Sequence, residues 1–219
     1  MRFVFYVFLF LLAISALIVL AAAARIAWSR VARPMPMSSD SAAQPRSTGI
    51  GDGLLLAATA LAWYNTASVW ICQRVVYPLY VDLSAVSQAA FHAYSHGYLS
   101  RIVFVIILPG GALWAVSALL LWFPCCNVSH LRRWLLVGFC FAALAITPIA
   151  ASAQGQMHDA GFSAALETRL LWSNWIRAIA FTGAGLVTLS MVRARWSGQS
   201  AQLVNFGESK GSNGRRHDA

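Results

Sequence analysis

Residues 73–101, QRVVYPLYVDLSAVSQAAFHAYSHGYLSR, form a long polar stretch between two apolar runs. The run before it covers 53–72 and the run after it covers 102–123. Each run has about the 20 residues that a helix needs to cross the ~30 Å hydrocarbon core of a bilayer. This alternation predicts an all-α, polytopic (multi-pass) membrane protein.

Two further apolar runs, 134–153 and 175–192, complete a four-helix transmembrane domain that we place at 53–192. A second polar stretch, 154–178, leads into the last run. Within the run 102–123, Pro109-Gly110-Gly111 predicts a kink or the close approach of a neighbouring helix. Pro148 predicts a bend near the end of the run 134–153.

Three segments lie outside this domain: an additional N-terminal transmembrane helix at 1–28, a flexible linker at 29–52 rich in Ser, Pro, Gly and Arg, and a disordered, basic cytoplasmic tail at 193–219. The apolar run 3–24 within the first segment has three interpretations. It is a retained helix, a cleaved signal peptide, or an untranslated stretch if synthesis starts at Met35 or Met37.

Composition places the chain in a lipid bilayer. Of its 219 residues, 59% are hydrophobic and 11% are charged, whereas a soluble domain has about 25% charged residues. The net charge is +9, but the basic residues lie between and after the apolar runs, where membrane topology and anionic headgroups account for them. No basic stripe is interleaved with aromatic residues, so nucleic-acid binding is not expected.

The distribution of Lys and Arg predicts the orientation. With five spans, eleven basic residues fall on one side: Arg25, Arg30, Arg33, Arg46, Arg132, Arg133, Arg193, Arg195, Lys210, Arg215 and Arg216. Five fall on the other: Arg2, Arg74, Arg101, Arg169 and Arg177. The positive-inside rule therefore predicts a cytoplasmic C-terminus and both polar stretches on the extracytoplasmic face.

The histidines of the polar stretches are candidate metal ligands. If 80–98 is one helix, then Asp82, His92 and His96 share one stripe of it, and His158 comes from the other stretch. A His-x-x-x-His pair with a third histidine matches the ligands of zinc or another transition metal, so His92, His96 and His158 form a candidate metal site. A haem would need a histidine facing His158 or Met157. The alternative interpretation is that these histidines hydrogen-bond and pack at the interface.

Arginines at the ends of the spans are candidates for ion pairs or ligand contacts. Arg101 or Arg177 could pair with Asp82, Asp159 or Glu167, and the alternative role of these arginines is to extend to lipid headgroups. Asn174 and Arg177 are three residues apart, share a helical face and could point into the bundle. The residues predicted to form ion pairs or to meet an anionic ligand are Asp82, Arg101, Arg169 and Arg177, and the candidate catalytic residues are His92, His96, His158, Asn174 and Arg177.

A set of these residues resembles a known pattern: Gln73, Tyr77-Pro78, Phe91-His92, His96, Arg101, His158, Arg169-Leu170 and Asn174-Trp175-x-Arg177. The pattern is similar to that of an uncharacterised bacterial family of four-helix integral membrane proteins and covers roughly 55–195. More distantly, the layout with Asn-x-x-Arg before the last span resembles the anthrone-oxygenase-like membrane family. That second resemblance implies oxygenation of polycyclic phenols and a site at His92, His96, His158, Asn174 and Arg177.

Two functions follow from this pattern. The first is a membrane protein without enzymatic activity whose extracytoplasmic His/Tyr/Arg face binds a ligand or a partner, such as a second copy or another membrane protein. The second is a membrane-bound oxygenase-like or redox enzyme with a His-centred site that holds a metal or haem. Transport is disfavoured because no ionisable residue falls near the middle of a predicted span. The chain has no Ser-His-Asp order, P-loop or thiol motif.

Overall fold

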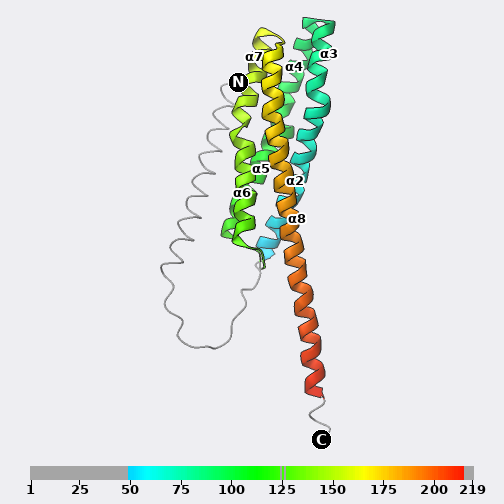
Figure 1. Cartoon of the computed structure of the whole chain (residues 1–219), viewed down its shortest axis with the longest axis vertical. Helices are drawn as coiled ribbons and strands as arrows, with labels where there is room; N and C mark the ends of the chain where they lie inside the picture. Colours follow the sequence, from blue (N-terminus) through cyan, green and yellow to red (C-terminus); the bar gives the residue numbers. More distant parts are fainter. Residues whose placement is uncertain (1–48, 124, 126, 215–219) are drawn as a thin grey trace, which may run out of the picture.

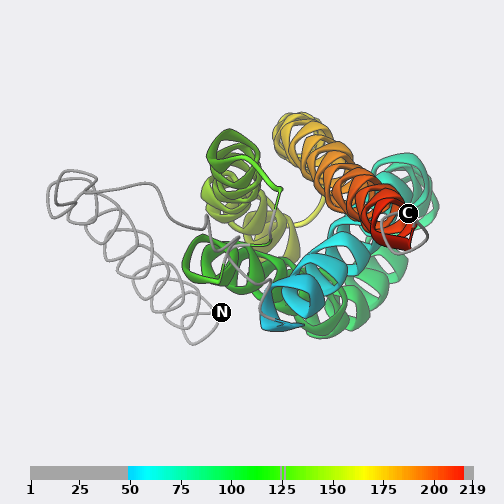
Figure 2. The ribbon, with the colours of Figure 1, turned by 90° about the horizontal axis from the view of Figure 1, so that it is seen from below.

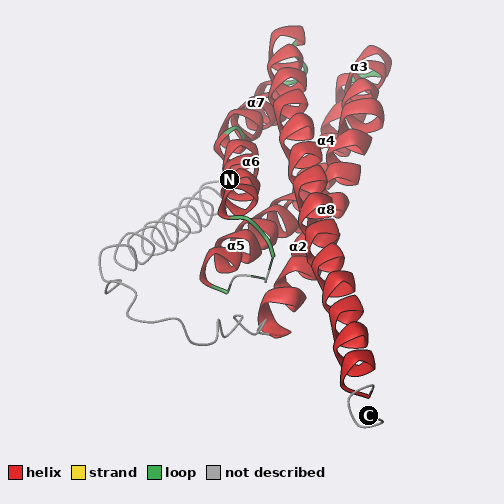
Figure 3. Cartoon of the chain, turned by 60° about the horizontal axis from the view of Figure 1, so that its bottom comes forward, coloured by secondary structure: helices red, strands yellow, loops and turns green. Residues whose placement is uncertain are grey.

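The computed structural model describes residues 49–123, 125 and 127–214. The predicted N-terminal helix at 1–28, and the predicted linker as far as residue 48, lie outside the described residues. In the described part, every regular element is a helix and none is a strand (Figure 3). The predicted all-α fold is therefore confirmed.

Four helical stretches of the described chain are long and apolar enough to cross a membrane: Gly49–Val86, Phe104–Trp122, His130–Ala160 and Ala164–Ser197. They correspond in order to the four apolar runs of the sequence. This agreement confirms a multi-pass membrane protein with a four-helix transmembrane core.

In chain order, the elements are α2 (Gly49–Ile71), the π-helical turn η1 (Cys72–Val76), α3 (Tyr77–Val86), α4 (Gln88–Ile102), the π-helical turn η2 (Val103–Ile107), α5 (Leu108–Trp122), α6 (His130–Ala145), α7 (Thr147–Ala160) and α8 (Ala164–Gly214). They form an antiparallel four-helix bundle (Figures 1 and 2). Helix α8 packs against α2, α6 and α7, while α5 packs against α2 and α6. We call the end with the α3–α4 and α7–α8 turns the cap end.

Two prolines follow the two π-helical turns. A proline ring clashes with the carbonyl group four residues earlier in an α-helix. For Pro78 that residue is Arg74, which lies in η1, and for Pro109 it is Val105, which lies in η2. The wider π-turn moves the carbonyl away from the ring, and a regular α-helix resumes at each proline. Such turns are frequent at functional sites.

The predicted bend at Pro148 is confirmed. At Gly110 a Cβ atom would lie 3.6 Å from Oδ1 of Asn65 and 3.7 Å from the ring of Phe181, which are ordinary van der Waals contacts, so the close approach at Pro109-Gly110-Gly111 stays a prediction. Pro148 stands in the first turn of α7, and α6 ends at Ala145, with Ile146 between the two helices. The third span is therefore divided near its cap end.

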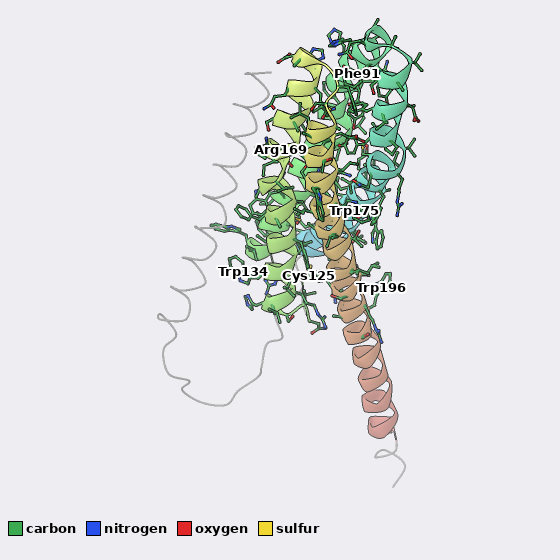
Figure 4. The ribbon with its side chains drawn as sticks, turned by 45° about the horizontal axis from the view of Figure 1, so that its top comes forward. Phe91, Cys125, Trp134, Arg169, Trp175 and Trp196 are labelled. Carbon is green, nitrogen blue, oxygen red and sulfur yellow. The ribbon has the colours of Figure 1, made fainter. Side chains whose placement is uncertain are left out.

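The interior of the bundle has two apolar cores. The larger core includes Leu55, Leu113, Leu136 and Phe181 and occupies the membrane layer. The second core lies at the cap end and consists of Cys72, Tyr77, Tyr80, Phe91, Ile106, Ala150, Ala153, Met157 and Leu170. Figure 4 shows Phe91 at the cap end, Trp196 toward the opposite end, and Trp175 between them.

The polar stretches are continuations of the spans and not loops. A helix crosses the hydrocarbon layer in about 20 residues. If the layer begins at the end opposite the cap end, at Asp52, Arg133 and Arg193, it ends near Cys72, Ala153 and Ser173. The helices extend beyond these positions and pack together around the second core. We call this layer, 72–102 with 150–173, the cap layer.

The predicted helical stripe that joined Asp82 to the histidines is wrong. Ser87 has extended backbone angles, φ −166° and ψ 150°, and ends α3. Its Oγ accepts a hydrogen bond from the backbone N–H of Ala90 at 3.0 Å, which caps the start of α4. The chain therefore reverses at Ser87. Asp82 stands on α3, whereas His92 and His96 stand on α4.

Two predicted boundaries also differ. Helix α2 begins at Gly49, inside the predicted linker 29–52, because Asp52 in its first turn suits the positive helix N-terminus and binds Arg195. Helix α8 continues to Gly214, whereas the sequence predicted a disordered tail from 193. The ion pair of Arg195 with α2 holds α8 in the bundle beyond the predicted end of the span, and no proline interrupts the chain after Pro148.

Candidate functional site

The structure brings two of the predicted site histidines together. The rings of His96 on α4 and His158 on α7 are stacked, with centroids 5.5 Å apart and an interplanar angle of 25°. Phe91 and Phe162 make a second contact between the two polar stretches, with centroids 6.0 Å apart. Both stretches therefore lie at the same end of the bundle, as the predicted site required.

The three-histidine metal site is not assembled. Nε2 of His92 lies 3.3 Å from the side-chain nitrogen of Gln88. Within the described residues, no three His, Cys, Asp or Glu side chains are placed to hold a metal ion. A metal is bound by nitrogen lone pairs in the ring planes, whereas His96 and His158 turn their ring faces to each other. The pair has the geometry of a packing contact between α4 and α7.

The predicted ion pairs at the cap end are also not formed. Asp82, Arg101 and Arg169 are exposed, and none of them makes an ion pair within the described residues. The ion pair that the structure shows lies at the opposite end, between Arg195 and Asp52. An ion pair between two exposed long side chains adds little stability in water. The charged side chains at the cap end therefore have little tendency to pair.

A buried amide group joins α8 to the first span. Asn174 is fully buried, and its Nδ2 donates hydrogen bonds to the carbonyl oxygen of Val69 at 3.1 Å and to Oε1 of Gln73 at 2.8 Å. Gln73 stands in η1 and is itself buried. The π-turn thus faces the middle of α8 and presents a polar side chain to it.

Arg177 lies one helical turn further along the same face of α8. Its side chain is only 3% exposed, and its Nε and Nη2 atoms are buried without a hydrogen-bond partner in the described chain. The prediction that Asn174 and Arg177 point into the bundle is confirmed. The alternative, that Arg177 extends to lipid headgroups, is wrong because the side chain is turned toward the first span.

The electrostatic neighbours of Arg177 are neutral groups. Its charge acts on the thiol of Cys72 and the phenol of Tyr77, both on the first span. No carboxylate of the described residues lies within ion-pair distance of it. An unpaired buried charge is costly in a low-dielectric interior, so this arrangement calls for an explanation. We call Gln73, Asn174 and Arg177 the polar layer.

A network of phenols lies in and around the second core, on the cap side of the polar layer. The hydroxyl of Tyr80 accepts a hydrogen bond from Nε2 of Gln154 at 2.9 Å, and the hydroxyl of Tyr98 lies 3.3 Å from Sγ of Cys72. The ring of Tyr80 also contacts those of Tyr94 and Tyr98. Burial raises the pKa of Tyr98 above its usual range and also raises the pKa of Tyr94. Both phenols therefore stay protonated near neutral pH.

The hydrogen-bonding roles of Gln154 and Cys72 were not predicted from the sequence, and Gln73 entered only as part of a resemblance. One signal was available. Each glutamine directly follows an apolar run and lies four residues after a buried apolar side chain, which is Val69 for Gln73 and Ala150 for Gln154. A polar residue in register with a buried face indicates a hydrogen bond inside the bundle.

Comparison with known proteins adds no further constraint, since no family model, curated protein or solved structure matches this chain.

Proposed function

We propose that this multi-pass membrane protein binds a small amphiphilic molecule at the junction of its membrane layer and its cap layer, with the polar head of that molecule at the polar layer. One observation carries the proposal: the junction contains buried hydrogen-bonding groups that the described chain leaves without partners. They are Nε and Nη2 of Arg177, Oδ1 of Asn174 and the hydroxyl of Tyr77.

Both donors and acceptors are involved, and this favours a ligand over a purely structural role. Buried polar groups in proteins are almost always hydrogen-bonded, and each one without a partner costs about 1–3 kcal/mol. The Asn174 side chain is itself held in place, because its Nδ2 donates two hydrogen bonds. A bound molecule with acceptor and donor atoms would satisfy the remaining groups.

The level of the polar layer in the bilayer suits an amphiphile. Arg177 stands about 24 Å along α8 from Arg193, at ~1.5 Å per residue, so it lies near the edge of a ~30 Å hydrocarbon layer. Trp70 and Trp175 form an edge-to-face pair close by, with centroids 5.2 Å apart. Tryptophans mark the boundary between hydrocarbon and headgroups. A tail would extend into the bilayer while its head reaches the polar layer.

The binding experiment compares two glutamines that differ in burial. The full chain is purified in a neutral detergent, and retained small molecules are identified by native mass spectrometry. Gln73→Leu is expected to lose most of the retained molecule, because Gln73 is a buried part of the polar layer. Gln156→Leu, at an exposed position of α7, is the matched control and should retain it. Equal retention by both variants, or none by the wild type, would contradict the proposal.

We also propose that the cap layer is extracytoplasmic and the C-terminus cytoplasmic, in a bacterial inner membrane. The count of eleven basic residues against five supports this orientation. Asp159→Cys at the cap end should react with a membrane-impermeant maleimide on intact cells, whereas Ser197→Cys at the opposite end should react only after lysis. The parent chain supplies the labelling baseline, and the reverse pattern would invert the topology.

A further inference from the structure

We infer that the ligand of the polar layer carries an anionic oxyacid group, a carboxylate or a phosphate, which binds side-on to the guanidinium of Arg177. The inference rests on the proposed function and names the chemistry of its ligand. It follows from which atoms of Arg177 lack partners, from the charges around them, and from a second arginine of the same helix.

The unpartnered atoms of Arg177 are the pair that binds oxyacids. Nε and Nη2 lie on one edge of the planar guanidinium, and their N–H groups run nearly parallel. That edge matches the two oxygens of a carboxylate or phosphate, and bidentate bonding of this kind is stronger and more specific than a single neutral hydrogen bond. Both atoms are buried without a partner in the described part of the chain.

Arg195 shows how the same edge is used when an acid is present. Its Nε donates to Oδ1 of Asp52 at 2.9 Å, and its Nη2 donates to Oδ2 of Asp52 at 3.0 Å. Arg195 and Arg177 are about five helical turns apart on one face of α8, and both are turned toward the first span. Opposite Arg195, the first span supplies the carboxylate of Asp52. Opposite Arg177, it supplies Cys72, Gln73 and Tyr77, which carry no charge.

The polar layer therefore contains one positive charge, on Arg177, with no negative charge of the described residues to neutralise it. Arg177 is 3% exposed, and a guanidinium keeps its positive charge in a protein interior. Neutral acceptors cannot compensate its charge. An oxyacid group would supply both the charge and the two acceptors.

A route for an anion to this position begins at the surface. Arg74 is exposed, belongs to η1 beside Gln73, and lies over the ring of Trp175 with its guanidinium carbon 5.9 Å from the ring centroid. A cation at the aromatic boundary attracts anionic headgroups. Arg74 would thus meet the anion first, and Arg177 would bind it in the interior.

The experiment uses the full chain in nanodiscs of neutral phosphatidylcholine. Dodecanoate and dodecyl phosphate are the anionic probes, dodecanol is the neutral analogue, and acetate and inorganic phosphate test a water-soluble source. Binding is followed by the fluorescence of the tryptophans. We expect the two anionic amphiphiles to bind about 10- to 100-fold more tightly than dodecanol, the range for a charge-assisted pair of hydrogen bonds.

Four variants locate the effect. Arg177→Met should weaken dodecanoate binding by about 10- to 100-fold, whereas Arg169→Met, at an exposed position of the same helix, should not change it. Arg177→Lys keeps the charge without the bidentate edge and should give an intermediate affinity. Gln73→Glu, which adds an internal carboxylate to the polar layer, should also weaken binding and covers the case in which an Arg177 variant does not fold.

The outcomes separate this inference from the proposed function. Anionic amphiphiles that bind while acetate and phosphate do not would support a lipid-like acid, and binding of the soluble anions as well would support a water-soluble one. Equal binding of dodecanol and dodecanoate, or unchanged binding by Arg177→Met, would overturn the inference and leave amphiphile binding intact. If no probe binds and the purified chain retains no molecule, both proposals fail.

Discussion

Arg177→Met is expected to raise the stability of the ligand-free protein by about 1–4 kcal/mol, the gain seen when buried ion pairs are replaced by well-packed apolar residues of similar volume. In a domain of this size, each kcal/mol corresponds to about 2–4 °C in the thermal midpoint. Arg177 is buried, has two N–H groups without partners, and faces no carboxylate in the described residues. Methionine has a similar length and removes the unpaired charge.

The measurement is the thermal unfolding of protein that has been exhaustively exchanged into neutral detergent. Arg195→Met is the matched control, because it removes an arginine that is already paired. That pair is partly exposed, with side-chain exposures of 14% and 36%, so its loss should lower stability by no more than about 1 kcal/mol. A fall in stability for Arg177→Met would mean that the guanidinium is already satisfied in the ligand-free protein.

The second large effect is expected at Asn174. Asn174→Leu should lower stability by about 1–3 kcal/mol for each buried acceptor that loses its donor. Those acceptors are the carbonyl oxygen of Val69 and Oε1 of Gln73, at 3.1 and 2.8 Å. Both belong to the first span around η1, so the substitution also releases the contact between this span and α8.

A double-mutant cycle tests whether this loss comes from the amide pair. Gln73→Leu together with Asn174→Leu replaces both partners, which costs less than leaving one of them buried and unpaired. The combined loss in the free energy of unfolding should therefore be smaller than the sum of the two single losses. Additive losses would show that the two side chains act independently and that the 2.8 Å contact contributes little.

The candidate site was only partly predictable from its residue types. The sequence placed Asn174 and Arg177 on one helical face, and the structure confirms it. It also predicted a metal site at His92, His96 and His158, and the structure pairs two of these histidines without a third ligand. The predicted stripe that joined Asp82 to these histidines depended on one helix through 80–98. Ser87 ends that helix, because Tyr80 packs against Phe91 across the hairpin, with ring centroids 5.5 Å apart.

The cap layer could not be predicted from the sequence, for a related reason. The tyrosines of 73–101 suggest an interfacial, solvated segment, yet Tyr77 and Tyr80 are fully buried. They are buried because Met157 and Leu170 come from distant parts of the chain to cover them. A second core built from four separate helices has no signature in any one of them.

By itself, the sequence determined that this is an all-α, multi-pass membrane protein with four spans in its core. The length and apolarity of a span are properties of consecutive residues, and the bilayer sets both. Only the tertiary structure decided that Arg177 is buried without a counter-ion while Arg195 is paired. Both are arginines near the ends of one span, and their difference depends on what α2 and η1 place opposite them: a carboxylate at Asp52, and only neutral groups at Cys72 and Gln73.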